Sequence, residues 1–165
     1  MQETPIQPEI LLAIPNQIAL HVTPEQFEML AAANRDMRLE RTATGGLIVN
    51  PPTGGDTSRS NSSLTTHLGN WYEANETLGE VFDSSGGFRL SNGATRSPDA
   101  AWVSRERWDA LNPQQRKGFV PLCPDFVVEL RSPSDSLSTL RTKMLEYLEN
   151  GTQLGWLIDP QYHRV

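Results

Sequence analysis

The sequence has few of the residues that build disulfides, sulfur-bound metal clusters or membrane spans. Cys123 is the single cysteine among 165 residues, which excludes an internal disulfide framework and a cysteine-based metal cluster and suits a reducing cytoplasm. The three histidines show no metal-ligand spacing. No apolar run approaches the roughly 20 residues that cross a bilayer, so we expect no membrane association. The N-terminus has no basic residue ahead of an apolar stretch, so it does not resemble a secretory signal.

Basic residues are also outnumbered by acidic ones. The chain has 14 Lys and Arg against 20 Asp and Glu, which gives a formal net charge of −6. Proteins that bind nucleic acid without specificity usually present a basic face, because they must neutralise phosphates. An enzyme acting on nucleic acid would therefore need a local basic patch here, or a metal that recruits phosphate.

The order of predicted elements indicates one α/β domain in residues 21–165, preceded by an extended arm in residues 1–20. Apolar periodicity and turn residues predict helices at about 23–34, 60–78, 104–111 and 137–149, and strands at 39–42, 47–49, 81–82, 88–90, 95–103, 125–130 and 154–158. We expect a curved mixed β-sheet flanked by helices. The strand at 125–130, the helix at 137–149 and the strand at 154–158 predict a β-α-β crossover with parallel strands. Residues 161–165 resemble the start of one more strand, so we expect the domain's final strand to be missing.

Two carboxylates and a lysine are the first candidates for a functional site. Glu129 lies within the apolar run Phe126–Leu130, where a lone buried carboxylate is costly unless a cation or hydrogen-bond donors face it. Asp99 follows a proline 30 residues earlier, and Lys143 lies on the predicted helix downstream. Two carboxylates with open coordination positions suit Mg²⁺, and a nearby ammonium can stabilise charge on a phosphate. This combination suggests a metal-dependent hydrolase.

Each of these residues also has an ordinary structural interpretation. Asp99 could be a surface residue at a strand end, Glu129 a glutamate on an edge strand, and Lys143 a helix lysine that extends along the surface to water. Spacing alone favours the structural interpretation of Asp99 and Lys143. For Glu129 the position within an apolar run makes the functional and structural interpretations about equally supported.

Four segments together resemble a known family. They are residues 96–99 (RSPD), 124–135 (PDFVVELRSPSD), 143–151 (KMLEYLENG) and 155–160 (GWLIDP). In this order and spacing they resemble the Uma-type restriction-endonuclease-like proteins, within the PD-(D/E)XK nuclease superfamily. The resemblance covers roughly Leu39 to the C-terminus.

The resemblance implies a restriction-endonuclease-like core and a Mg²⁺- or Mn²⁺-dependent site that hydrolyses phosphodiester bonds, with DNA as partner and a homodimer as the expected assembly. Asp99 and Glu129 match the metal-binding acids. The usual lysine would lie two residues after the glutamate, where this chain has Arg131, and Lys143 matches a position to which some relatives have moved it. We therefore count Arg131 with Lys143 among the catalytic candidates. Glu40 or Asn61 could supply a further polar group.

Two other functions remain open at this stage. The acidic charge and Arg131 favour a catalytically inactive nuclease fold that serves binding or oligomerisation. A hydrolase acting on a phosphate compound other than nucleic acid would also suit a negative surface.

Overall fold

The computed structural model describes residues 18–165, so most of the arm predicted for residues 1–20 lies outside the described part of the chain. The elements, in chain order, are α1 (Pro24–Ala33), β1 (Arg38–Arg41), β2 (Leu47–Asn50), α2 (Gly55–Glu73), the 3₁₀ turn η1 (Glu76–Leu78), β3 (Gly79–Asp83), β4 (Phe88–Arg89), β5 (Thr95–Arg96), β6 (Ala100–Ser104), α3 (Arg105–Asp109), β7 (Phe126–Leu130), α4 (Leu137–Glu149) and β8 (Leu154–Ile158).

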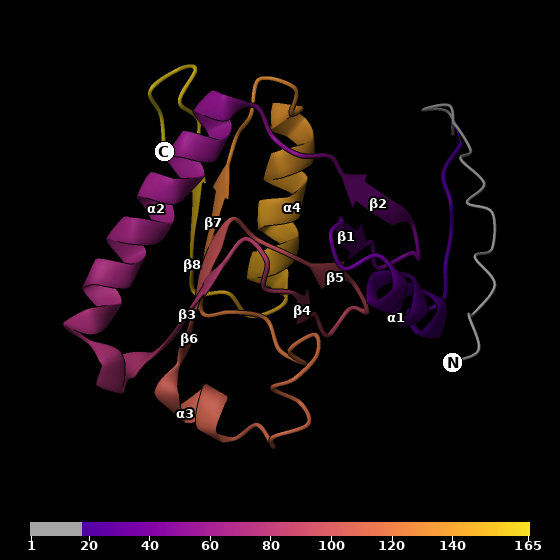
Figure 1. The fold of residues 1–165 in the computed structure, drawn as a ribbon, viewed down its shortest axis with the longest axis horizontal. Coiled ribbons are helices and arrows are strands. Elements are labelled where there is room, and N and C mark those ends of the chain that lie inside the picture. Colours follow the sequence, from indigo (N-terminus) through magenta and orange to yellow (C-terminus); the bar gives the residue numbers. More distant parts are fainter. Residues whose placement is uncertain (1–17) are drawn as a thin grey trace, which may run out of the picture.

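The strands form a mixed α/β fold, as the sequence predicted, but they divide into two sheets. One sheet has the order β2-β1-β5-β4 and the other β3-β6-β7-β8. Helices α2 and α4 flank the second sheet, and α1 lies beside the first (Figure 1). The predicted strand 95–103 is broken between β5 and β6 at residues 97–99, so its two halves belong to different sheets. Asp99 lies at this crossing.

The unit β7-α4-β8 is the predicted crossover. β7 pairs in parallel with β8 and antiparallel with β6, which makes the second sheet mixed. Ser136 caps α4 by accepting a hydrogen bond from the Thr139 amide. On β8, a side chain at Gly155 would overlap the Met144 methyl group, so glycine lets α4 pack closely on the sheet.

Helix α4 turns a different face to the protein than the sequence predicted. The expected apolar stripe ran through Leu137, Leu140, Met144 and Leu148. The helix buries Met144 as predicted, but with it Tyr147, while Leu148 is 47% exposed. The inward face therefore includes Lys143, which lies one turn before Tyr147.

Helix α2 differs from its predicted bounds of 60–78. It begins at Gly55, without a side-chain cap at Gly54 but with Asp56 in its first turn, and it ends at Glu73. An acidic residue in the first turn interacts favourably with the helix dipole, which supports the earlier start. Within residues 18–165, no helix has the length and apolarity needed to cross a membrane.

Candidate functional site

Asp99 and Glu129 come together because β6 pairs with β7. The Asp99 amide donates to the Val128 carbonyl (3.0 Å), and the Asp99 carboxylate accepts from the Leu130 amide (2.8 Å). Asp99 is thus bonded to the backbone on both sides of Glu129. Asp99 is 6% exposed and Glu129 is 3% exposed, so two carboxylates are buried side by side along the sheet.

Lys143 reaches these carboxylates from α4. Its Nζ lies 2.7 Å from Glu129 Oε1 and 2.8 Å from Glu40 Oε1. Glu40 comes from β1 in the other sheet, and it is almost completely buried. We call Glu40, Asp99, Glu129 and Lys143 the carboxylate cluster. The sequence predicted three of its members as site residues and offered Glu40 as one of two choices for a further group.

Two arginines pair with acids of the cluster, and sequence reasoning did not assign them to the site. Arg38 Nη1 lies 2.9 Å from Asp99 Oδ1, and its other terminal nitrogen donates to the Ser97 carbonyl. Arg96 Nη1 lies 3.3 Å from Glu40 Oε2. Arg38 stands two residues before Glu40 on β1, so alternation along a strand could have placed both on one face.

Tyr147 is the second α4 residue at the cluster. Its hydroxyl donates to Glu129 Oε1 (3.0 Å), and the side chain is completely buried. The signal for it was available in the sequence, because Tyr147 follows Lys143 by four residues and so lies on the same helix face. Glu129 Oε1 therefore accepts from both Lys143 and Tyr147.

Burial and neighbouring charge shift the pKa values of the cluster in opposite directions. Burial raises the pKa of Glu129 to about 7; Lys143 opposes this rise, and the negative charges of Asp99 and Glu40 add to it. Burial acts in the same direction on Glu40, but Lys143 and Arg96 outweigh it and lower the pKa of that carboxyl. Burial lowers the pKa of Lys143, yet the two glutamates more than compensate, so the net shift is upward and the ammonium stays protonated.

The structure does not bring the remaining two candidates to the cluster. Arg131 Nη1 lies 2.8 Å from Asp159 Oδ2, and the guanidinium faces the Tyr162 ring at 5.8 Å. Asn61 lies on α2, and its buried Oδ1 has no hydrogen-bond partner within residues 18–165. The position of the usual superfamily lysine thus holds an arginine that pairs with the turn after β8.

The second sheet is mixed, with Glu129 on β7, Asp99 directly before β6 and Lys143 on the helix that follows β7. Comparison with protein families defines the class more closely. Residues 24–165 match the Uma2 family, described as "Putative restriction endonuclease", and the chain belongs to that family. The match begins at α1, upstream of the segment in which the sequence motifs lie.

A solved structure has the same fold. It is described as a putative nuclease belonging to DUF820 from Anabaena variabilis ATCC 29413, and it is 22% identical to this chain with a TM-score of 0.67. The similarity covers 85% of this chain and 75% of that one. No curated protein matches the chain.

The carboxylate oxygens of the cluster are the type of ligand that Mg²⁺ prefers. Mg²⁺ is commonly bound by one or two carboxylates, with water and phosphate oxygens as its other ligands. In residues 18–165 no group of three or more His, Cys, Asp or Glu side chains has metal-binding geometry, so a metal at the cluster would have at most two of these carboxylates as ligands. Glu129 Oε2 has no protein hydrogen-bond donor in that range, whereas Asp99 Oδ1 is held by Arg38. A metal at Asp99 would have to displace this arginine.

Proposed function

We propose that the chain is a metal-dependent nuclease that hydrolyses phosphodiester bonds in DNA. Asp99 and Glu129 would hold Mg²⁺ or Mn²⁺, and Lys143 would provide a cation at the reacting phosphate. The observation that carries the proposal is the placement of Lys143, a buried ammonium held within 2.8 Å of two glutamates beside Asp99. We place the activity in the cytoplasm, with which the single, buried Cys123 is compatible.

The residues of the site have distinct parts in this chemistry. A bound divalent metal polarises a phosphodiester and lowers the pKa of an attacking water. Lys143 stays protonated and stabilises negative charge on the phosphate oxygens as the bond to the leaving group breaks. The fork of Arg38 matches phosphate geometry and can exchange Asp99 for a phosphate oxygen. Tyr147 holds the Glu129 carboxylate in position through its hydrogen bond.

Membership of the Uma2 family supports a nuclease role, and the fold shared with the DUF820 nuclease agrees with it. The departure at Arg131 is consistent with the proposal, because Lys143 provides the cation at the carboxylates while Arg131 pairs with Asp159. Arg131 therefore has no catalytic part in this proposal.

Cleavage of plasmid, linear duplex DNA, single-stranded DNA and RNA, with Mg²⁺ or Mn²⁺ against EDTA, tests the proposal. We expect Asp99→Asn and Glu129→Gln to lower the rate by about 10³-fold, because several kcal/mol of metal-dependent stabilisation would be lost at roughly tenfold per 1.4 kcal/mol. The matched control is Asp125→Asn, which changes another buried carboxylate at the opposite end of β7.

We expect the control to cleave at nearly the wild-type rate once its fold is verified by circular dichroism. Equal cleavage by wild type, Asp99→Asn and Glu129→Gln would rule out this site. A comparison with small phosphomonoester and diester substrates separates a nuclease from a hydrolase of other phosphate compounds.

One observation favours a second function. Each acid of the carboxylate cluster already has a cationic partner without metal, and Glu40 shares its partner Arg96 with Glu146. A nuclease fold retained for binding, as a homodimer, would show this property. No heat of Mn²⁺ binding by calorimetry, together with a stable dimer in sedimentation, would support this second function over the first.

A further inference from the structure

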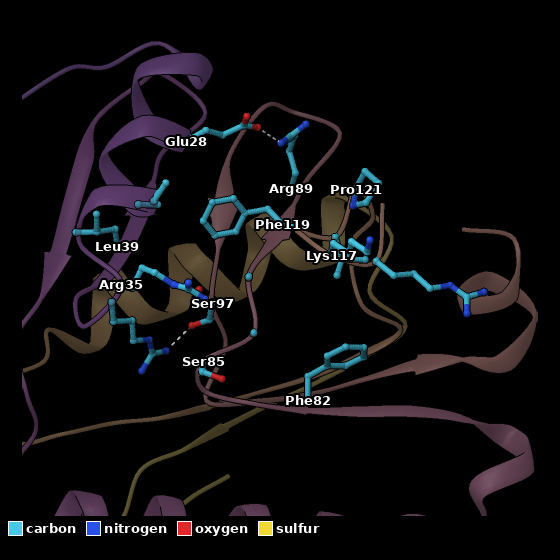
Figure 2. A pocket seen from close by; sticks show the side chains of 18 of the residues that line it. Glu28, Arg35, Leu39, Phe82, Ser85, Arg89, Ser97, Lys117, Phe119 and Pro121 are labelled. Carbon is cyan, nitrogen blue, oxygen red and sulfur yellow. Dashed lines mark hydrogen bonds and ion pairs between the residues drawn. The ribbon is translucent and has the colours of Figure 1, made fainter. Parts of the chain in front are cut away.

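An open groove of about 1160 Å³ lies beside the carboxylate cluster. Its described walls come from α1 and the turn after it, from residues 84–87 and from the connector 112–121 (Figure 2). Arg38 and Ser97 also line it. Because Arg38 bonds both the Asp99 carboxylate and the Ser97 carbonyl, the groove reaches the cluster through this one side chain.

The lining of the groove has a net positive charge, whereas the chain as a whole is net negative. Its described lining has five basic side chains, namely Arg35, Arg38, Arg89, Arg116 and Lys117. It has two acidic ones, Glu28 and Asp36, which leaves a formal charge of +3 in a chain of net charge −6. A polyanion would therefore be attracted to this surface although the chain as a whole repels it.

The five cations differ in how far protein acids already neutralise them. Arg89 pairs with Glu28, and Arg38 pairs with Asp99. Arg116 lies 3.7 Å from Asp109, an exposed pair that contributes little. Arg35 and Lys117 are exposed and have no ion-pair partner within residues 18–165.

The two cations without partners stand on either side of the groove. Figure 2 shows Arg35 and Lys117 separated by Phe119, which is half-buried and packs on Phe27 with ring centroids 5.3 Å apart. Arg38 lines the same groove, and its side chain is 27% exposed. Its guanidinium can turn a donor from the Asp99 carboxylate to a phosphate oxygen, because the fork fits either group.

We infer that this groove binds the sugar–phosphate backbone of a nucleic-acid strand. Arg35 and Lys117 contact phosphates from either side of the groove, and Arg38 contacts the phosphate that reaches Asp99. The inference rests on the proposed nuclease function and adds the path by which the substrate approaches. It also supplies the local basic patch that an acidic chain needs in order to hold a polyanion.

Binding without cleavage tests the groove. Fluorescence anisotropy of labelled single-stranded and duplex oligonucleotides in EDTA gives the affinity at several salt concentrations. The variant is Arg35→Gln with Lys117→Gln. The control is Arg59→Gln with Arg141→Gln, which removes two exposed cations from α2 and α4, outside the groove lining.

Loss of two phosphate contacts should reduce the slope of log K against log salt by about 1.4 for single strands or about 1.8 for duplex. The affinity at low salt should fall by roughly tenfold or more, because each contact releases counterions. The control should keep the wild-type slope. Comparing the two oligonucleotides shows which form of nucleic acid the groove takes.

An unchanged slope in the groove variant, or no binding by the wild type in EDTA, would overturn the inference. These outcomes are separable from the proposed function, which is measured by metal-dependent cleavage. If the protein cleaves but the groove variant binds like wild type, the proposed nuclease function stands and the inference about the groove is ruled out. If the groove variant binds more weakly than wild type but the wild type never cleaves, the groove is supported and the proposed nuclease function is ruled out.

Discussion

The two ends of β7 bury carboxylates in different ways. At its start, Asp125 accepts from the Ser104 amide (2.8 Å), from Arg107 (2.8 Å) and from the Gln153 side chain (3.2 Å). Each of these donors serves that one carboxylate. Toward its end, Glu129 shares Lys143 with a second glutamate, and Asp99 lies beside it.

The difference separates a structural carboxylate from a candidate functional one. Asp125 is a single charge with dedicated donors, a common arrangement for a buried acid. Glu129 belongs to three crowded acids, and burial raises its pKa to about 7. Crowded like charges cost stability unless cations hold them together, and such perturbed groups are concentrated at functional sites.

Lys143→Met should give the largest effect on stability. It removes the cation shared by Glu40 and Glu129 and leaves two buried acids facing each other, which typically costs about 3–5 kcal/mol. The free energy of unfolding from urea titration measures this loss. At the other end of β7, Arg107→Met removes a partner that is 36% exposed, so we expect a loss of about 1 kcal/mol there.

A double variant sharpens this prediction. Adding Glu129→Gln to Lys143→Met removes one of the two uncompensated acids, so part of the lost stability should return. Equal losses for Lys143→Met and Arg107→Met, or no recovery in the double variant, would mean that the two ends of β7 do not differ as proposed.

Neutralising the acid itself should cost more stability at the Asp125 end of β7 than at the Glu129 end, the reverse of the order expected for removing the cations. Asp125→Asn replaces a charged acceptor by a neutral one and should cost about 2 kcal/mol, within the range for hydrogen bonds to charged groups. Glu129→Gln removes a crowded, desolvated charge, so its stability should change by less than about 1 kcal/mol or rise. Urea midpoints compare the two. A larger loss at Glu129 than at Asp125 would contradict the distinction.

Local signals in the sequence predicted the second half of the fold well. The apolar runs of β7 and β8, with the predicted helix between them, define a β-α-β unit within 35 residues. The same runs indicated that Glu129 is buried. Helix α2 was harder to delimit, because it buries none of its side chains fully and lacks a capping side chain at its start.

The partners of the acids could not be predicted in the same way. Lys143 and Glu40 are separated by 103 residues and belong to α4 and β1, so only the packing of the two sheets shows that they meet. The pairing of Arg38 with Asp99 likewise spans 61 residues. Arg131 shows the reverse case: the family resemblance placed it among the catalytic candidates, but Asp159 in the turn after β8 holds the side chain elsewhere.

The smallest expected effect concerns metal affinity at Asp99. Arg38 and Arg107 are matched, because each is a partly exposed arginine paired with a buried aspartate near one end of β7. Arg38→Gln removes the cation that competes for Asp99 Oδ1, and we expect Mn²⁺ to bind roughly tenfold more tightly, which corresponds to about 1.4 kcal/mol. Titration calorimetry in the absence of nucleic acid measures this directly.

Arg107→Gln should leave Mn²⁺ affinity unchanged, because in the described part of the chain Asp125 is held by dedicated donors and not by a cation shared with a second acid. If Arg38→Gln binds Mn²⁺ no better than wild type, then Arg38 does not compete with the metal. The two aspartate–arginine pairs would then be equivalent structural contacts. If affinity rises only for Arg38→Gln, the arginine and the metal exclude each other at Asp99. A phosphate that draws Arg38 away would then favour metal binding, since whatever removes the competing cation raises the affinity of the site that it leaves.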